Sequence, residues 1–207
     1  MKILVIDYGM GNIKSILNAL KNICNHEILV STDYSQISNS DAFILPGVGA
    51  FRDAMMNLHE KNYIEPLLNE IINKQKPILG ICLGMQLLFS YSEEGGINKG
   101  LDLIEGGVII LNPGSNYRVP HVGWNDLIIK KPLMFEGLRN DLNVYFVHSY
   151  YAQTSSDYIT ATFEYGSEYT ASVMKNNIWG TQFHPEKSQK NGFQILKNYI
   201  TFCERGF

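Results

Sequence analysis

The sequence has few cysteines and no long apolar or basic runs. Its three cysteines are odd in number and widely spaced, and no two form a Cys-x-x-Cys pair, which excludes a disulfide-stapled scaffold and a zinc–thiolate site. No apolar run approaches the roughly 18 residues of a membrane helix, and Asp7 interrupts the first apolar run too early for a signal peptide. The longest basic cluster is the pair Lys130 and Lys131. We therefore expect a cytoplasmic protein that binds neither membranes nor nucleic acids.

The composition favours one large folded domain. Hydrophobic residues make up 45% of the chain and charged residues 18%, which provides a sizeable core and excludes disorder. Seventeen basic and twenty acidic residues leave a net charge of −3. No linker, internal repeat or low-complexity stretch divides the sequence, and 207 residues fit one large domain better than two small ones. The prediction is a single domain over residues 1–207.

The first half of the chain alternates between buried-strand and amphipathic-helix patterns. The continuous apolar run at residues 3–6 is typical of a strand buried on both faces of a parallel sheet. The predicted strands are residues 3–6, 27–30, 42–45 and 77–81, and the predicted helices are residues 13–23, 51–63, 64–74 and 83–91. Repeated strand–helix units imply right-handed crossovers and a mainly parallel sheet.

The second half has a different pattern. Residues 103–183 hold short β-prone segments separated by Gly, Asn, Pro and Ser, so we expect some antiparallel pairing there. The clearest segments are residues 144–147, 159–163, 170–174 and 179–183, and a final helix is predicted over residues 189–203. The predicted fold class is therefore α/β, with a mainly parallel central sheet flanked by helices and antiparallel strands added in the second half.

A cysteine stands at a predicted strand-to-helix turn. Residues 80–84 read G-I-C-L-G, the Gly-x-nucleophile-x-Gly arrangement in which glycines permit a tight, strained turn. Cys82 would be exposed there at the carboxyl edge of the sheet and next to a helix N-terminus, which favours a nucleophilic thiolate. Gln86 lies one helical turn later, on the same face. We interpret Cys82 as a nucleophile, and Cys24 and Cys203, which lie in helical apolar patterns, as core residues.

A cysteine nucleophile needs a base, and the base needs an orienting group. H-P-E at residues 184–186 offers both, because proline favours an extended backbone before it and residues i and i+2 of an extended segment project to the same side. His184 would be the base and Glu186 its partner. Two other histidines lie in polar segments and are interpreted as structural, namely His26 and His59. Two more lie between β-prone residues and remain possible bases, namely His121 and His148.

Two glycine-rich segments follow predicted strands. P-G-V-G at residues 46–49 should lie near Cys82, where its backbone N–H groups and that of Leu83 could stabilise an oxyanion. G-M-G at residues 9–11 begins like a dinucleotide fingerprint, but Lys14 occupies the third glycine position, so no such cofactor is predicted. The histidines and carboxylates lack metal-ligand spacing, and cysteine chemistry needs no metal.

Together these motifs resemble those of a known family. L-P-G-V-G at 45–49, G-I-C-L-G-M-Q at 80–86 and H-P-E at 184–186 resemble the three signatures of class I (triad) glutamine amidotransferases, whose fold is flavodoxin-like. Four further segments, at residues 6–12, 119–125, 147–151 and 182–189, are similar to the glutaminase subunits of imidazole glycerol phosphate synthases. Val122 departs mildly from that pattern, because its position is often a methionine.

The resemblance implies a glutaminase that needs no cofactor. Cys82 would attack the side-chain amide of glutamine, His184 would transfer the protons, and Glu186 would orient His184. Ammonia would then pass to a cyclase subunit with a (β/α)₈ barrel fold, the other half of a heterodimer. The resemblance also assigns glutamine-binding side chains and backbone oxyanion donors, which are Gln86, Ser149 and Tyr150 for the former and Gly49 and Leu83 for the latter.

Partner contacts, a switch and three alternatives complete the expectations. Four residues are candidates for the partner-facing side, namely Asn12, Pro120, Trp124 and Lys187. We hypothesise that residues 46–49 act as a switch, because glycines permit a peptide to reorient. The alternatives are the glutaminase subunit of another synthase, such as those making anthranilate or pyridoxal phosphate, a scaffold with an inactive triad, and a hydrolase of γ-glutamyl peptides. G-W-N at 123–125 and H-S-Y at 148–150 argue against another synthase.

Overall fold

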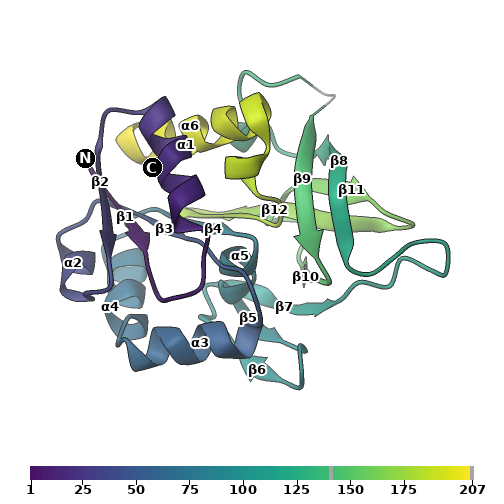
Figure 1. Cartoon of the computed structure of the whole chain (residues 1–207), viewed down its shortest axis with the longest axis horizontal. Helices are drawn as coiled ribbons and strands as arrows, with labels where there is room; N and C mark the ends of the chain where they lie inside the picture. The colour runs from purple at the N-terminus through teal and green to yellow at the C-terminus, as the bar shows by residue number, and fades with distance from the viewer. Residues whose placement is uncertain (140–141, 206–207) are drawn as a thin grey trace.

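The computed structural model describes residues 1–139 and 142–205, and its largest element is a nine-stranded sheet (Figure 1). The strand order is β2-β1-β3-β4-β13-β12-β11-β8-β9. These strands are β1 Lys2–Ile6, β2 Glu27–Ser31, β3 Ala42–Leu45, β4 Ile78–Ile81, β8 His121–Ile129, β9 Asn143–His148, β11 Ile159–Glu164, β12 Glu168–Lys175 and β13 Ile178–Thr181. The strands from β2 to β13 in this order pair in parallel, and the others pair antiparallel. The predicted mixture of parallel and antiparallel pairing is confirmed.

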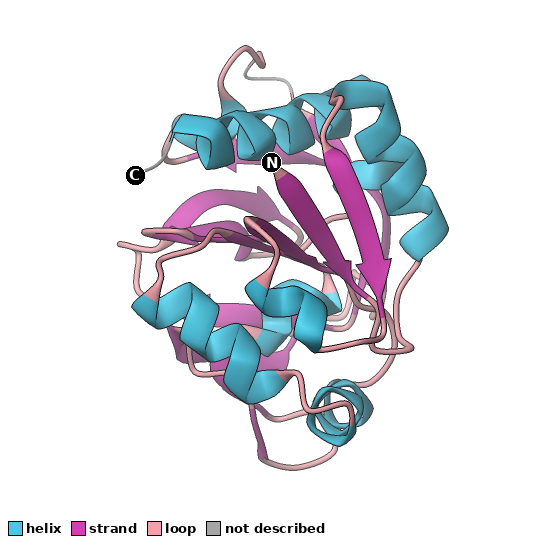
Figure 2. Cartoon of the chain, turned by 90° about the vertical axis from the view of Figure 1, so that its left-hand side faces the viewer, coloured by secondary structure: helices cyan, strands magenta, loops and turns pink. Residues whose placement is uncertain are grey.

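Helices cover both faces of this sheet (Figure 2). One face carries α1 (Ile13–Ile23) and α6 (Gln189–Arg205), and the other carries α3 (Phe51–Glu60) and α4 (Ile64–Leu68). Side chains of alternate β1 residues pack on opposite faces of the sheet. Ile3 and Val5 pack in the core beneath α1 and α6, whereas Leu4 and Ile6 pack in the core beneath α3. A strand buried in this way needs the continuous apolar run that the sequence contains.

A second sheet, of four strands, corrects one prediction. Its order is β10-β7-β5-β6, and its strands are β5 Phe89–Ser92, β6 Asn98–Lys99, β7 Ile104–Ile110 and β10 Tyr150–Thr154. The helix predicted over residues 83–91 was too long, because α5 covers only Leu83–Leu87 and the chain then enters β5. The carbonyl of Leu88 accepts hydrogen bonds from the N–H groups of Leu103 and Ile104, so bonds to a distant segment replace the helical ones.

Two smaller departures occur in the first half. Residues 64–74, predicted as one helix, form α4 followed by a π-helical turn at Asn69–Asn73. A short helix that the sequence did not predict, α2 (Ser35–Ser38), precedes β3. Within the described residues, no helix combines the length and the apolar character needed to cross a membrane.

The carboxyl ends of β3, β4 and β13 meet at one edge of the large sheet. Leu45 pairs with Gly80, and Ile81 pairs with Thr181. The loop of residues 46–49, Cys82 and the segment 182–186 therefore leave neighbouring strands side by side. In open α/β sheets, ligands bind at this edge.

Candidate active site

Cys82 occupies the sharp turn between β4 and α5. Its φ of 55° and ψ of −112° lie outside the regions that most residues adopt. The flanking glycines are required by close packing, because a Cβ atom at Gly84 would lie 1.8 Å from the carbonyl oxygen of Leu45, and one at Gly80 would lie 2.6 Å from that of Gly84. The cysteine is almost buried yet lines a pocket. The turn thus has the strand–turn–helix geometry that the sequence predicts for a nucleophile.

His184 and Glu186 form a buried pair. The distance from His184 Nδ1 to Glu186 Oε1 is 2.8 Å, and the two side chains are only 2% and 1% exposed. The pairing was predicted, but the reason given for it was wrong in part. His184 is extended, whereas Pro185–Lys187 forms a 3-10 turn that brings the carboxylate back to the ring. The carboxylate holds a hydrogen on Nδ1 and so directs the other nitrogen, Nε2, away from itself.

The electrostatics of His184 suit a catalytic base. Its Nε2 atom is buried and has no hydrogen-bond partner among the described residues. Burial alone would lower the pKa of His184, but the neighbouring Cys82 and the Glu186 carboxylate raise it to about 9. A ring with this pKa can take the proton of a thiol, and the resulting imidazolium stabilises the charged sulfur. The three side chains have the chemistry of nucleophile, base and orienting carboxylate.

A pocket of about 300 Å³ opens over Cys82. The residues predicted to act on the substrate line this pocket, except for Glu186, which is buried next to His184. The lining residues among them are Gly49, Cys82, Leu83, Gln86, Ser149, Tyr150 and His184. The sequence analysis missed the carboxylate of Glu94, which also lines the pocket. It follows β5, a strand that the sequence assigned in part to a helix. A pocket of this size admits a small polar molecule.

Two amide side chains connect the pocket to the cysteine. Gln86 Nε2 donates to the carbonyl oxygen of Tyr150 and to Oε1 of Gln182, both at 3.0 Å. Gln182 is fully buried, and its Nε2 atom lies 3.8 Å from Cys82 Sγ. The structure therefore places Gln86 in the site, as predicted. Gln182 was missed, although its position two residues before His184 is a signal that could have found it.

The glycine-rich loop of residues 46–49 is fixed by a tyrosine. Tyr8 Oη donates to the carbonyl oxygen of Pro46 at 2.7 Å, and a Cβ atom at Gly47 would lie 2.5 Å from this hydroxyl. Burial raises the pKa of Tyr8 well above its usual range, so the hydroxyl stays a donor. At Gly49 φ is +101°, which residues with a side chain rarely adopt. Donation from this loop to an oxyanion stays a prediction.

The predicted partner-facing residues are at least partly exposed. Trp124 is 46% exposed and packs against the ring of Tyr145, with 6.0 Å between ring centroids. Lys187 Nζ lies 5.8 Å from the centroid of the same ring, so these two residues belong to one surface. Pro120 precedes β8, and Asn12 caps α1 by accepting a hydrogen bond from the N–H of Ser15 at 3.3 Å.

The other histidines and cysteines have different surroundings. His121 Nδ1 lies 3.2 Å from His148 Nε2, so these two alternative bases bond to each other, whereas the ring whose pKa the neighbouring Cys82 raises is that of His184. His26 pairs with Glu204 at 2.6 Å, and His59 is exposed. The remaining two cysteines pack against the core as predicted, namely Cys24 and Cys203.

Curated relatives match almost the full chain. Imidazole glycerol phosphate synthase subunit HisH 2 of Vibrio vulnificus is 51% identical over 205 residues, which cover 99% of this chain and 96% of that protein. Imidazole glycerol phosphate synthase subunit HisH of Aquifex aeolicus is 46% identical over 207 residues, which cover 99% of each.

Solved structures and a family model agree on the fold. A structure described as a glutamine amidotransferase has a TM-score of 0.76 at 16% identity and covers 97% of this chain and 98% of its own. A structure of PurLQS from Thermotoga maritima has a TM-score of 0.72 at 18% identity and covers 97% of each chain. The family model described as glutamine amidotransferase class-I matches residues 4–201. Because that match spans nearly the whole sequence, the chain belongs to the class I glutamine amidotransferase family.

Proposed function

We propose that this chain is the glutaminase subunit of an imidazole glycerol phosphate synthase. It hydrolyses L-glutamine to glutamate and ammonia, and a cyclase subunit uses the ammonia to form imidazole glycerol phosphate and AICAR in histidine biosynthesis. The observation that carries the glutaminase activity is the buried His184–Glu186 pair next to Cys82 in a pocket of amino-acid size. The names of the full-length relatives, which are subunits of that synthase, support the choice of pathway.

The reaction follows from the three side chains. His184 Nε2 takes the thiol proton, and the Cys82 sulfur attacks the amide carbon of the glutamine side chain. The tetrahedral intermediate collapses when imidazolium gives its proton to the leaving nitrogen, which departs as ammonia and leaves a γ-glutamyl thioester. A water molecule, deprotonated by His184, then attacks the thioester, and the proton returns to the sulfur as glutamate leaves. Glu186 stabilises the imidazolium in both halves of the reaction.

The pocket supplies the contacts that hold glutamine. Backbone N–H groups of Gly49 and Leu83 stabilise the oxyanion, and Gln86, Ser149 and Tyr150 bind the polar groups of the substrate. Glu94 adds a negative charge to the same pocket, and glutamine carries a positively charged α-amino group. We assign Glu94 to that group on the basis of charge complementarity.

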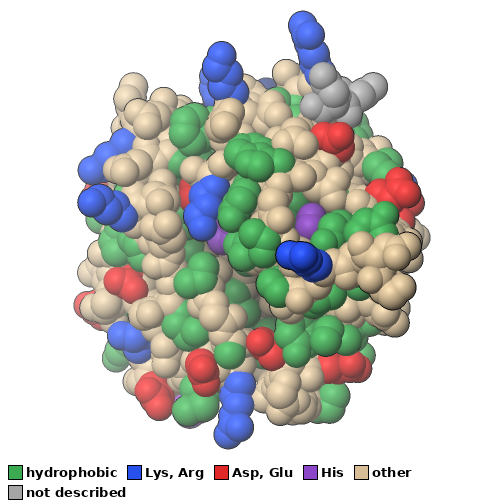
Figure 3. Space-filling model, turned by 45° about the vertical axis from the view of Figure 1, so that its right-hand side comes forward, with side chains coloured by type: hydrophobic (Ala, Val, Ile, Leu, Met, Phe, Trp, Pro, Cys, Tyr) green, Lys and Arg blue, Asp and Glu red, His purple; other side chains and the backbone are tan. Residues whose placement is uncertain are grey.

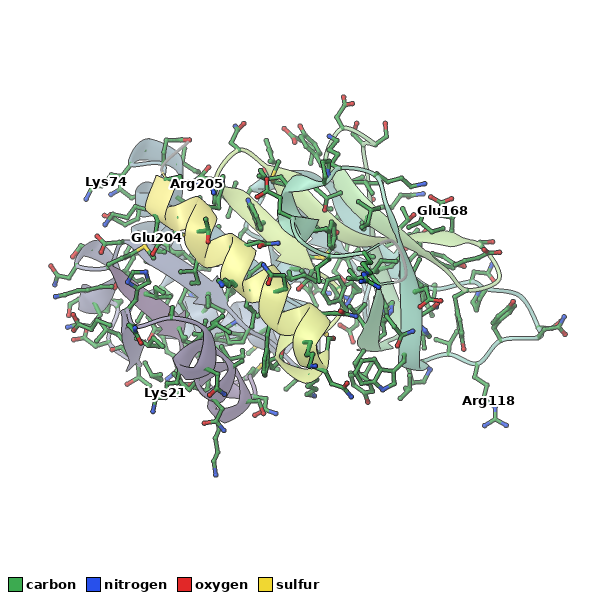
Figure 4. All side chains as sticks on the ribbon, turned by 90° about the horizontal axis from the view of Figure 1, so that it is seen from above. Lys21, Lys74, Arg118, Glu168, Glu204 and Arg205 are labelled. Atoms are coloured by element: carbon green, nitrogen blue, oxygen red, sulfur yellow. The ribbon has the colours of Figure 1, made fainter. Side chains whose placement is uncertain are left out.

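The partner is a cyclase subunit of (β/α)₈ barrel fold, which binds on the side of β8 and β9. Figure 3, which brings this side forward, shows hydrophobic side chains gathered among scattered charged ones. Exposed hydrophobic residues of β8 and of the loop before it are Tyr117, Val119, Val122, Trp124 and Ile128. Arg118 lies in the projecting loop that precedes β8 in the sequence (Figure 4). A covered interface suits the chemistry, because ammonia that meets bulk water at neutral pH becomes ammonium, which has no lone pair for attack.

Two broader proposals accompany this function. We take residues 1–207 as one amidotransferase domain, because strands from both halves of the chain pair in the same sheet and the family model spans residues 4–201. We also place the enzyme in the cytoplasm, because a catalytic thiol and two further free cysteines suit a reducing compartment.

An electrophilic analogue of glutamine tests the nucleophile. We expect a diazoketone analogue to label Cys82 in the complex with the cyclase, and glutamine to protect it. Cys24 and Cys203 are internal controls, and burial raises the pKa of Cys203 to about 12, so its sulfur should stay unlabelled. Labelling spread equally over the three cysteines, or labelling that glutamine does not slow, would contradict the proposed pocket.

Replacement of an exposed aromatic residue tests the partner surface. Trp124→Ala should weaken binding of the cyclase by about tenfold or more, because exposed tryptophans often dominate interface energy. Tyr34→Ala is the matched control, since Tyr34 is 50% exposed and lies beside α2, on the opposite side of the molecule in Figure 1. Equal affinities for the two variants in a titration with the cyclase would overturn the assignment of this surface.

A further inference from the structure

A chain of hydrogen bonds between side chains leads from β8 to the glutamine pocket. Asn125 Nδ2 lies 3.5 Å from His121 Nε2, and His121 Nδ1 lies 3.2 Å from His148 Nε2. His148 Nδ1 lies 2.8 Å from the carbonyl oxygen of Tyr150. The two histidines stand directly opposite each other on β8 and β9. None of the predicted catalytic roles uses this pair.

The positions of the hydrogens in this chain of hydrogen bonds follow from its last acceptor, the carbonyl oxygen of Tyr150. A carbonyl oxygen only accepts, so His148 Nδ1 carries a hydrogen. Burial lowers the pKa of His148 to about 3 and that of His121 to about 4, so both rings are neutral at physiological pH. His148 Nε2 must then accept from His121 Nδ1, which leaves His121 Nε2 to accept from Asn125. Every ring nitrogen in the chain has one defined role.

Aromatic packing fixes the orientation of His121. Its ring stacks on Phe163 with 5.1 Å between ring centroids and an interplanar angle of 11°. The centroid of the Tyr165 ring lies 4.2 Å from that of His121. His121 and His148 are only 3% and 6% exposed. The pair is therefore a closely packed, almost buried connection between two strands.

The carbonyl oxygen of Tyr150 is the point where this chain meets the pocket. It accepts from His148 Nδ1 and also from Gln86 Nε2, which uses both of its lone pairs. The pocket is lined by His148 itself and by the residues that this carbonyl ties together, Gln86, Ser149 and Tyr150. Loss of the His148 donor would leave this carbonyl with Gln86 Nε2 as its remaining side-chain partner, and its orientation toward Gln86 would be less well fixed, although Gln86 would still donate to Gln182 Oε1.

We propose that His148 is a positioning residue of the glutamine pocket, which fixes the Tyr150 carbonyl and through it Gln86, and that His121 holds His148 in the tautomer this task requires. The inference rests on the proposed glutaminase function, because the residues so fixed are those assigned to glutamine. It assigns to neither ring a part in proton transfer.

Paired substitutions test His148 in the complex with the cyclase. His148→Leu removes the donor, whereas His148→Asn keeps one, because Asn Nδ2 can occupy the place of ring Nδ1. We expect the leucine variant to raise the KM for glutamine about tenfold with a smaller change in kcat, and the asparagine variant to restore KM to within about threefold of wild type. Alkylation of Cys82 by iodoacetamide, a probe too small to need the pocket contacts, should proceed at the wild-type rate in both.

His121 provides a second pair outside the pocket. His121→Leu should raise KM in the same direction, and His121→Asn should rescue it. His26→Leu is the control for loss of a histidine, since His26 pairs with Glu204 on the surface. If the leucine variant at position 148 fails to fold, the variants at position 121 decide the question. An unchanged KM in folded leucine variants, or a KM that neither asparagine variant restores, would overturn the inference. Wild-type complex that releases no glutamate would instead overturn the proposed function.

Discussion

His184 Nδ1 and Glu186 Oε1 lie 2.8 Å apart, in side chains that are almost completely buried. A carboxylate in this position stabilises the protonated ring, and together with the adjacent Cys82 it keeps the pKa of His184 near 9 despite burial. The turn Pro185–Lys187 places the Glu186 carboxylate beside His184, and through His184 it affects the reactivity of the Cys82 sulfur at the end of β4.

Removal of the Glu186 charge should reduce the effect of this residue on His184 and Cys82. Glu186→Gln can still accept a hydrogen bond from Nδ1, but it no longer favours the imidazolium, so the pKa of His184 should fall. We expect kcat to drop about 10- to 100-fold. Alkylation of Cys82 at neutral pH should slow, because less imidazolium is present to stabilise the charged sulfur. A pH profile of alkylation that matches wild type would show that Glu186 has only a structural role.

The loop of residues 46–49 can be tested at Gly49. Gly49→Pro is incompatible with the φ of +101°, so the variant should lose cyclase-stimulated glutamine hydrolysis while iodoacetamide still alkylates Cys82. Gly137→Pro is a matched control, because Gly137 also has a positive φ of +77° and does not line the pocket. Stimulation that survives in Gly49→Pro would sink the hypothesis that this loop is the switch.

Tyr8 should combine a stabilising and a functional role. Tyr8→Phe leaves the carbonyl of Pro46 without its donor, which should cost about 1–2 kcal/mol of unfolding free energy and lower glutaminase activity several-fold. Tyr199→Phe removes a similar buried bond, from Tyr199 Oη to the carbonyl of Phe43 at 2.8 Å, and neither of these residues lines the pocket. Urea unfolding should show comparable losses for the two variants, whereas only Tyr8→Phe should lose activity. Equal activities would limit Tyr8 to stability.

The pH dependence of stability should reflect two buried neutral histidines. Because the folded state lowers the pKa of His121 to about 4 and that of His148 to about 3, the unfolded chain binds more protons below pH 6.5 or so. The unfolding free energy should therefore fall as pH decreases from about 6.5 towards 4, by up to about 1.4 kcal/mol per pH unit for each ring. Urea titrations should show a smaller slope in His121→Leu. An identical slope would mean that other groups cause the acid sensitivity.

His184 should act in the opposite sense. Its folded pKa is raised to about 9, so its contribution to stability is complete below about pH 6.5 and is lost as pH rises through 9. His184→Gln should remove this alkaline decline in urea unfolding between pH 7 and 10 or so. A decline that persists unchanged in the variant would contradict the raised pKa.

Local patterns explain why much of the fold and the core of the site were predictable. The apolar run at residues 3–6 is required by burial on both faces, and the glycines around Cys82 are required by contacts below 3 Å. The motif of residues 184–186 specified a histidine–glutamate pair even though the backbone turn that makes it was not foreseen.

The parts that escaped prediction depend on contacts between distant segments. Residues after Leu88 look helical alone, and pairing with β6 and β7 makes them a strand. Gln86 meets Gln182 across 96 positions of sequence, and Tyr8 meets Pro46 across 38. The tyrosine has no local signature for this role, and although the spacings of Gln86 from Cys82 and of Gln182 from His184 place both near the site, neither spacing predicts that the two amides bond to each other.

The most direct test of the account is glutamate release from glutamine by the purified chain, alone and with the cyclase plus its nucleotide ligand. The account predicts little release by the chain alone, strong stimulation in the complex, and none in either condition for Cys82→Ala. No release in any condition would contradict the assignment to this synthase. Full activity without the cyclase would contradict the coupling and indicate a free-standing hydrolase.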